Sequence, residues 1–228
     1  MEDNIKIIPL SIVNAYLVKT GDGFILIDTG IAQKWTALET ELIATGCLPD
    51  KLKLVIVTHG DFDHTGNCAR LQEKYKVKIA MHKNDAPMVE TGVIEKRTIR
   101  SPFMRLFIAF ATFAERFKKD GTGFNKFKAD LFLSDGQSLS EFGFKAKIHY
   151  LPGHTKGSIA ILSDEGSLFA GDLVSSMGGK PNIAPIIDNI DSLKESISKL
   201  KKLKIKMVYP GHGKPFSGEA LLKVIDHN

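Results

Sequence analysis

Residues 52–66 read LKLVIVTHGDFDHTG, and this stretch decides how the chain is interpreted. Its apolar, β-branched first part predicts a buried strand over 52–58. Two histidines and two aspartates follow at once, within the six residues 59–64. Either this is a polar turn rich in charge, or the strand delivers ligands to a metal, since histidine and carboxylate are common metal ligands. The other strand ends of the sequence distinguish these interpretations.

Three later segments repeat the same order of an apolar strand, a tight glycine turn, and a histidine or aspartate. They are IHYLPGHTKGS (148–158), GSLFAGDLV (166–174) and IKMVYPGHG (205–213). Glycine lets the backbone turn sharply where a strand ends, so the next side chain points off the sheet edge. Four strand ends then offer enough nitrogen and carboxylate donors for two divalent metal ions. These donors are His59, Asp61, Asp63, His64, His154, Asp172 and His212.

In this order, the motifs HGDFDH, PGHTKGS, AGDL and PGHG resemble those of the metallo-β-lactamase fold hydrolases. The signature of that family is His-x-His-x-Asp-His after a buried strand, then a Gly-His-Thr turn, an aspartate after a strand, and a final Gly-His. The resemblance spans about residues 5–215. It implies an α/β fold, a four-layer αββα sandwich of two mixed β-sheets with helices on the outer faces. It also implies a metal-dependent hydrolase that attacks its substrate with a metal-bridged hydroxide.

The resemblance assigns a role to each candidate site residue. One metal would be held by His59, Asp61 and His154. A second would be held by Asp63, His64 and His212, with Asp172 bridging the two. Asp63 would also act as the catalytic residue that orients the water and moves its proton. Asp28, in FILIDTG, matches an aspartate that supports a ligand histidine.

Asp61 departs from the family pattern, which has a histidine at this position. An extra carboxylate favours oxygen-loving ions such as iron or manganese alongside zinc, which is still the first choice. A carboxylate here also resembles the di-iron branch of the family, so a non-heme iron redox enzyme is one alternative. Another is that Asp61 does not coordinate, which would leave a weakened or single-metal site.

The order of predicted elements is compatible with one domain over residues 1–228. Three short strands are expected to form an antiparallel meander before residue 30. The predicted elements of the chain come in two batches, each with strands first and helices later, and the second batch begins with the strand at 130–134. The predicted helices cover 33–45, 64–75, 191–203 and the C-terminus. The predicted strands cover 52–58, 77–81, 130–134, 146–152, 158–164, 166–172 and 205–210.

A helical insertion is predicted at about residues 85–128, with an aromatic stripe on one helix face. The stripe consists of Phe103, Phe107, Phe110, Phe113 and Phe117. A helix packed on the domain explains such spacing most simply. The alternatives are a lid that contacts an apolar acyl chain, a membrane-surface contact, or the interface of a homodimer.

Composition and charge limit the classes of partner molecule that the protein is expected to bind. The chain has 228 residues, 43% of them hydrophobic, and a net charge of +5. Its lysine-rich segment at 192–206 has apolar residues at helical spacing, so the lysines are expected on a solvated face and no nucleic-acid partner is expected. The start lacks the features of an export signal, which indicates a cytoplasmic protein, and no apolar run is long enough for stable membrane insertion.

The leading functional prediction is therefore hydrolysis of a small-molecule ester, thioester or lactone, with an apolar acyl portion on the substrate. A phosphodiesterase and an iron redox enzyme of the same fold are the enzymatic alternatives. A catalytically silent ligand-binding protein is a third, although the full set of candidate ligands argues against it. The natural substrate depends on variable loops, which sequence patterns do not specify.

Overall fold

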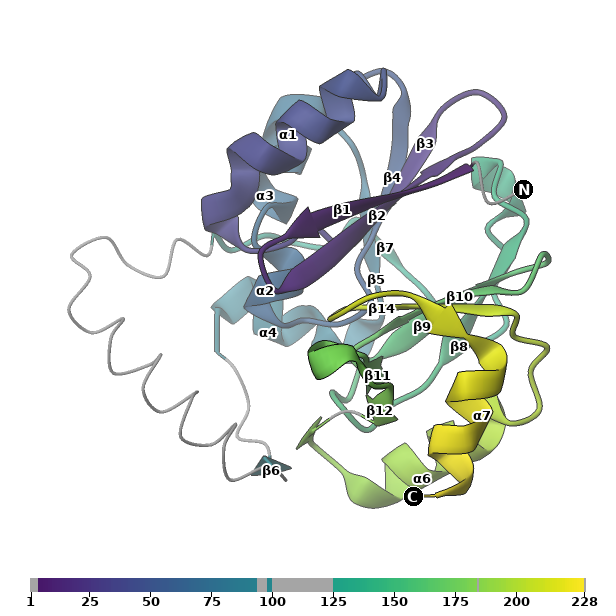
Figure 1. Ribbon diagram of the computed structural model, residues 1–228. Coiled ribbons are helices and arrows are strands. Elements are labelled where there is room, and N and C mark those ends of the chain that lie inside the picture. Colours follow the sequence, from purple (N-terminus) through teal and green to yellow (C-terminus); the bar gives the residue numbers. More distant parts are fainter. Residues whose placement is uncertain (1–3, 94–97, 100–124, 184, 228) are drawn as a thin grey trace.

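A computed structural model describes residues 4–93, 98–99, 125–183 and 185–227. Two mixed sheets pack face to face, and helices cover their outer faces (Figure 1). The N-terminal half, purple to teal, forms most of one layer pair, and the green to yellow C-terminal half forms the other. The αββα sandwich predicted from the sequence is confirmed.

The first sheet joins an antiparallel meander to three parallel strands. Its order is β1 (Ile5–Leu10), β2 (Val13–Lys19), β3 (Phe24–Ile27), β4 (Leu52–Ile56), β5 (Ile79–Met81) and β7 (Leu131–Phe132). The predicted meander is confirmed. The sequence grouped the strand at 130–134 with the later strands, and this was wrong, because β7 pairs in parallel with β5.

The second sheet is built from the later strands, with β10 parallel to β14 and its other pairs antiparallel. Its order is β15 (Phe216–Ser217), β14 (Met207–Pro210), β10 (Ser167–Gly171), β9 (Ile159–Ser163) and β8 (Ala146–Tyr150). Two small ladders lie beside it, β11 (Val174–Ser175) with β12 (Asn182–Ile183) and β13 (Ile186–Ile187) with β6 (Thr98–Ile99).

Strand alternation sorts the apolar side chains into three layers. In β3, Leu26 packs toward the outer helices, whereas Ile25 and Ile27 pack between the sheets. Phe169 of β10 faces the same central layer, and its neighbour Leu168 faces the opposite side. Because successive side chains on a strand point to opposite faces, each sheet needs a cover on both sides.

The outer helices provide that cover. The helices α1 (Trp35–Ala44) and α3 (Cys68–Tyr75) lie over the first sheet, and α6 (Ile190–Leu200) and α7 (Gly218–Asp226) lie over the second. Among the described residues, the remaining helices are α2 (Phe62–Thr65), α4 (Ala86–Thr91) and the short η2 (Ala32–Lys34), η3 (Lys83–Asp85), η4 (Ser140–Phe142) and η5 (Met177–Gly179).

The single helix predicted over 64–75 is instead two helices, α2 and α3. Asn67 stands at the break, and its side-chain amide donates to the carbonyls of Thr29 and Ile31. Gly66 packs so closely that a Cβ there would lie 2.4 Å from the backbone nitrogen of Ala32. These contacts with the loop after β3 interrupt the helix and fix the orientation of α2.

Of the predicted insertion at 85–128, the structure describes α4, β6 and the residues from 125 onward. The aromatic stripe from Phe103 to Phe117 lies outside the described residues, so its role as packing, lid or interface stays a prediction.

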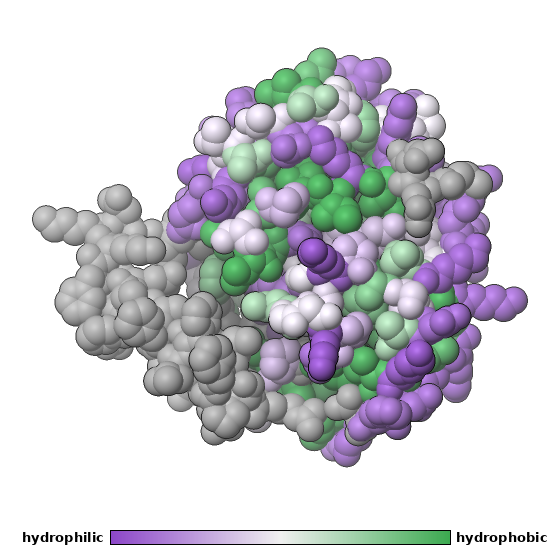
Figure 2. All heavy atoms as spheres, in the orientation of Figure 1, coloured by the Kyte–Doolittle hydropathy of each residue, from purple (hydrophilic) through white to green (hydrophobic). Residues whose placement is uncertain are grey.

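The lysine-rich helix is amphipathic as predicted. Leu193 and Leu200 of α6 are buried, whereas Lys194 and Lys199 are exposed. Figure 2 shows hydrophilic side chains gathered at the lower right, where Figure 1 places α6 and α7. Within the described part of the chain, no helix is both long and apolar enough to cross a membrane.

Candidate metal centre

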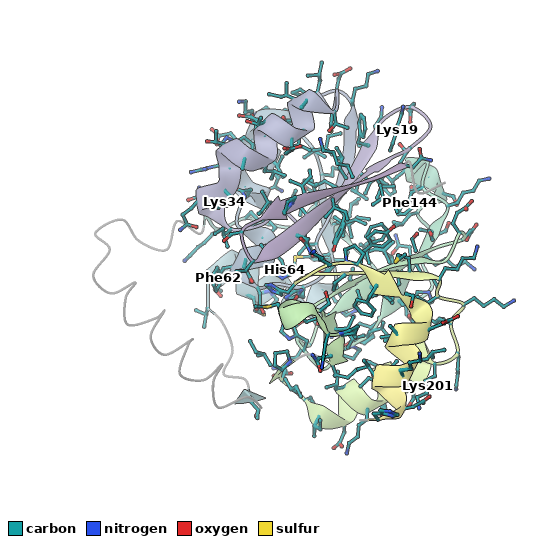
Figure 3. The ribbon with its side chains drawn as sticks, in the orientation of Figure 1. Lys19, Lys34, Phe62, His64, Phe144 and Lys201 are labelled. Carbon is teal, nitrogen blue, oxygen red and sulfur yellow. The ribbon has the colours of Figure 1, made fainter. Side chains whose placement is uncertain are left out.

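The candidate ligands converge at one edge of the sandwich, where strands of both sheets end. His59 follows β4, His154 follows β8, Asp172 follows β10 and His212 follows β14. In Figure 3, His64 lies at the centre of the molecule, between the N-terminal and C-terminal halves. Segments far apart in the sequence therefore supply one site.

Two groups of side chains have ligand atoms close enough to share a metal ion. One group is His59, His154 and Asp172, and the other is Asp63, His64 and His212, with all ligand atoms of a group within 4.8 Å of one another. Six of the seven residues expected from the sequence belong to these two groups. The seventh, Asp61, lies beside His59 and His154 of the first group, so all seven lie at this edge.

Asp172 lies between the two groups. Its Oδ2 is 3.1 Å from His212 Nε2 and 3.8 Å from His154 Nε2, and its Oδ1 is 3.3 Å from His64 Nε2. One carboxylate thus faces histidines of both groups. This is the position that the expected bridging role requires.

Asp61 turns its carboxylate toward the first group. Its Oδ2 lies 3.1 Å from His154 Nε2 and 3.4 Å from His59 Nε2. Its side chain is 12% exposed. The Asp61 carboxylate, at the position where the family has a histidine, therefore points at His59 and His154, as a ligand at this position would.

Hydrogen bonds at Nδ1 turn the Nε2 atoms of three imidazoles toward the centre. His154 Nδ1 lies 2.8 Å from the Ile186 carbonyl, and His212 Nδ1 lies 2.7 Å from the Ile12 carbonyl. A carbonyl only accepts, so Nδ1 carries the proton and Nε2 remains available as a ligand.

Asp28 fixes the third imidazole and confirms the supporting position predicted for it. Its Oδ2 is 2.8 Å from His64 Nδ1, and its carboxylate also accepts hydrogen bonds from the backbone nitrogen and hydroxyl of Thr58. Asp28 has a φ of 58°, a left-handed conformation that is costly for a residue with a side chain. This strain accompanies a residue that organises the site.

The histidines and carboxylates of the site shift the pKa values of one another. Burial disfavours the charged form of His212, but Asp172 and Asp63 raise its pKa to about 10. Burial likewise opposes charge on His64, whose pKa is nevertheless raised well above its usual value by Asp172 and Asp28. Burial also opposes charge on Asp172, whose pKa is held well below its ordinary range by His212 and His64. The carboxylates of the site therefore favour a positive charge beside them, whether it is carried by a histidine or by a cation.

Buried polar atoms at the site are a further indication that these residues hold a metal ion. Three buried atoms, His59 Nε2, His64 Nε2 and Asp172 Oδ1, make no well-directed hydrogen bond within the described residues. Buried polar atoms without partners cost free energy, so native proteins rarely keep them without a purpose. Divalent cations would be ligated by these atoms and would balance the charge of the carboxylates.

Sequence reasoning missed one side chain that holds the last ligand turn. Asn14 donates from Nδ2 to the Gly213 carbonyl at 2.7 Å, and its backbone nitrogen donates to the Gly211 carbonyl at 2.8 Å. Both contacts flank His212. The only signal in the sequence is a polar residue inside the apolar β2, which does not by itself indicate a contact about 200 residues away.

Gly211→Ala is expected to weaken metal binding by at least about tenfold. A Cβ at Gly211 would lie 2.2 Å from Asp172 Oδ1 and 2.6 Å from His64 Cε1, so the site must distort. Gly21→Ala is the matched control, because a Cβ there meets nothing within 4 Å. Metal titration measures the effect, and equal affinities of the two variants would contradict the geometry.

Comparisons with known proteins agree with this arrangement. The sequence profile of the metallo-beta-lactamase superfamily matches residues 8–212. A probable metallo-hydrolase of Methanocaldococcus jannaschii is 30% identical over 88% of this chain and 87% of its own length. The human acyl-coenzyme A thioesterase MBLAC2 is 23% identical over 92% of this chain and 76% of its own length.

Solved structures show the same fold. A metallo-beta-lactamase family protein of Thermus thermophilus superposes with a TM-score of 0.72 and 21% identity, covering 99% of this chain and 79% of its own. The profile match includes all seven candidate ligands, from His59 to His212. The chain belongs to the metallo-beta-lactamase superfamily.

Proposed function

We propose that this member of a metal-dependent hydrolase superfamily cleaves an ester, thioester or lactone with the help of two divalent ions. The observation that carries the proposal is the pair of facing ligand groups with Asp172 between them. An acyl substrate suits such a site, because hydrolysis of a carbonyl needs a water nucleophile and an acceptor for the charge that develops on the carbonyl oxygen.

The donor set suggests how two ions would be held. His59, Asp61 and His154 would hold one ion; Asp63, His64 and His212 would hold the other; and Asp172 would contact both. Two divalent ions, when bound, supply a nucleophilic water at neutral pH and polarise the substrate carbonyl. Zinc is the first choice for a site with four imidazoles, and Asp61 keeps iron and manganese as alternatives.

Asp63 is the proposed proton acceptor. Its Oδ2 lies 3.3 Å from His212 Nε2, and its side chain is 17% exposed, more than those of Asp61 and Asp172. Burial raises the pKa of the Asp63 carboxyl, but His64 and the hydrogen bond with His212 keep it below its usual value. An ionised carboxylate that is partly exposed can orient an attacking water and take its proton.

An apolar portion of the substrate is supported by exposed side chains next to the ligands. Phe62, between Asp61 and Asp63, is 46% exposed, and Ile12, whose carbonyl accepts from His212, is 51% exposed. One relative is described as an acyl-coenzyme A thioesterase, which acts on an acyl thioester. Both observations favour an acyl chain over a phosphodiester.

A panel of substrates tests the proposal. Metal-loaded protein is assayed against p-nitrophenyl esters of increasing chain length, acyl thioesters, lactones and bis-p-nitrophenyl phosphate. Acyl hydrolysis that rises with chain length would support the proposed class. Turnover of the phosphodiester alone would overturn it.

Asp61 carries a second candidate function, non-heme iron redox chemistry, because its carboxylate faces His59 and His154. Elemental analysis of purified protein and an oxygen-consumption assay separate the two candidates. Iron together with oxygen uptake would favour the redox enzyme, and zinc with acyl hydrolysis would favour the hydrolase.

Asp61→His is expected to preserve acyl hydrolysis and to shift metal preference toward zinc. Imidazole is a softer donor than carboxylate, so this exchange favours zinc over manganese and iron. The measurement is relative affinity for zinc and manganese by chelator competition, with wild type as the reference. An unchanged zinc-to-manganese ratio would show that Asp61 does not contact the ion.

A further inference from the structure

Asp85 is a fully buried carboxylate that none of the sequence motifs includes. It ends the short helix η3 and has an exposed fraction of 0%. Three donors point at it: the Gly60 nitrogen at 2.8 Å, the Thr155 hydroxyl at 2.7 Å and the Gly157 nitrogen at 2.6 Å. A carboxylate with several hydrogen bonds from fixed donors is held rigidly and holds its donors in turn.

The three donors come from two loops that carry candidate ligands. Gly60 stands between His59 and Asp61, and Thr155 directly follows His154. These loops are far apart in sequence and follow strands of different sheets, β4 and β8. Asp85 is therefore a side chain that ties the loop of two ligands to the loop of the third.

The packing around Asp85 leaves little freedom. A Cβ at Gly157 would lie 2.5 Å from Asp85 Cγ, and a Cβ at Gly60 would lie 3.2 Å from Asp85 Cβ. Both loops use glycine at the contact, so their backbones approach the carboxylate more closely than any other residue would permit. Asp85 thus bridges the two loops, whose flanking residues are also joined by the hydrogen bond from the Ile159 nitrogen to the Thr58 carbonyl at 2.9 Å.

We propose that Asp85 is a positioning residue for one metal ion, the ion held by His59, Asp61 and His154. This role rests on the proposed function, because it needs an ion at that group. The other group, Asp63, His64 and His212, is supported by Asp28 at His64 and by Asn14 and the Ile12 carbonyl at His212. Asp28 also holds the Thr58 hydroxyl, which lies 3.0 Å from His59 Nδ1, so His59 keeps this support when Asp85 is replaced. Replacement of Asp85 should therefore weaken the binding of one of the two ions.

The chemistry of the contact requires a carboxylate. Asp85 Oδ2 accepts from both Gly60 and Thr155, and Oδ1 accepts from Gly157. An amide of the same shape has only one acceptor oxygen, and its NH₂ group would face a backbone N–H. Asp85→Asn consequently loses at least one of the three hydrogen bonds and places an NH₂ group against a backbone N–H of a ligand loop.

The test is a zinc titration of metal-free Asp85→Asn against a chromophoric chelator, below the melting temperature. We expect one of two equivalents to bind about 10- to 100-fold more weakly than in wild type, with the other unchanged. Cobalt(II) absorption of the substituted protein should change for the same single equivalent. Neither readout depends on activity.

Asp130→Asn is the matched control. Asp130 also accepts from a backbone nitrogen, that of Ile79 at 2.8 Å, but it lies on the approach to β7 rather than beside a ligand loop. Both zinc equivalents and the hydrolytic rate should match wild type. A lower melting temperature with wild-type zinc affinity in Asp85→Asn would mean that Asp85 only stabilises the fold, and would overturn the proposal.

Thr155→Val keeps the test decisive if Asp85→Asn does not fold. It removes one of the three hydrogen bonds and retains the shape of the side chain, so a smaller loss in the same zinc equivalent is expected. Unchanged affinity in this variant would overturn the role of Asp85. Wild-type protein that binds no ion at this group would overturn the proposed function as well, whereas wild type with two ions and an unaffected Asp85→Asn would overturn the positioning role alone.

Discussion

Asp63→Asn is expected to lower kcat for acyl-ester hydrolysis by about 10²- to 10⁴-fold, the range typical of a lost general base. The amide keeps the size of the side chain but cannot take a proton from water. It also loses the negative charge that faces His212 Nε2 at 3.3 Å, so weaker binding of the second ion is expected in addition. Steady-state kinetics at saturating zinc isolates the loss in kcat from the loss in affinity.

Asp50→Asn is the control for Asp63→Asn. The Asp50 side chain is 72% exposed and stands in the turn before β4, away from the ligands. Its kinetics should equal those of wild type. If Asp63→Asn kept the wild-type kcat when saturated with zinc, Asp63 would be neither the proton acceptor nor an essential ligand.

His154→Ala is expected to abolish one zinc equivalent and to lower kcat/KM by on the order of 10²-fold or more. His154 faces Asp61 Oδ2 at 3.1 Å and Asp172 Oδ2 at 3.8 Å, so alanine removes a donor from the middle of one ligand group. It also leaves the Ile186 carbonyl without the hydrogen bond from Nδ1. Metal content after dialysis and ester hydrolysis measure the two effects.

His149→Ala provides the matched histidine control. His149 lies in β8, five residues before His154, and belongs to neither ligand group. Two bound zinc ions and wild-type kinetics are expected for this variant. Equal zinc content in His154→Ala and His149→Ala would contradict the assignment of His154 as a ligand.

The sequence predicted the features that local patterns encode. Apolar runs that end in glycine turns located the strands and, at their ends, all seven side chains that the structure brings to one edge. The layer order was implied by the resemblance to the metallo-β-lactamase fold, with which the succession of strands and helices is compatible. These features are local in sequence, so strand and turn chemistry suffices to recognise them.

Such local patterns could not predict contacts between segments that are far apart in the sequence. Asn14 and Asp85 hold ligand loops through side chains whose own neighbourhoods look ordinary, and the Ile186 carbonyl is a backbone atom that no residue type marks. The break between α2 and α3 similarly arises from contacts of Asn67 with the loop after β3. In each case the partner is set by the tertiary fold, which local propensity does not contain.

Metal removal and restoration test the central claim most directly. The metal-free protein, prepared with a chelator and then freed of it, is assayed against an acyl ester while zinc is added in fractions of an equivalent. We predict negligible hydrolysis without metal and recovery that is complete at two equivalents, one for each ligand group. Hydrolysis of the same ester at full rate by the metal-free protein would contradict the account.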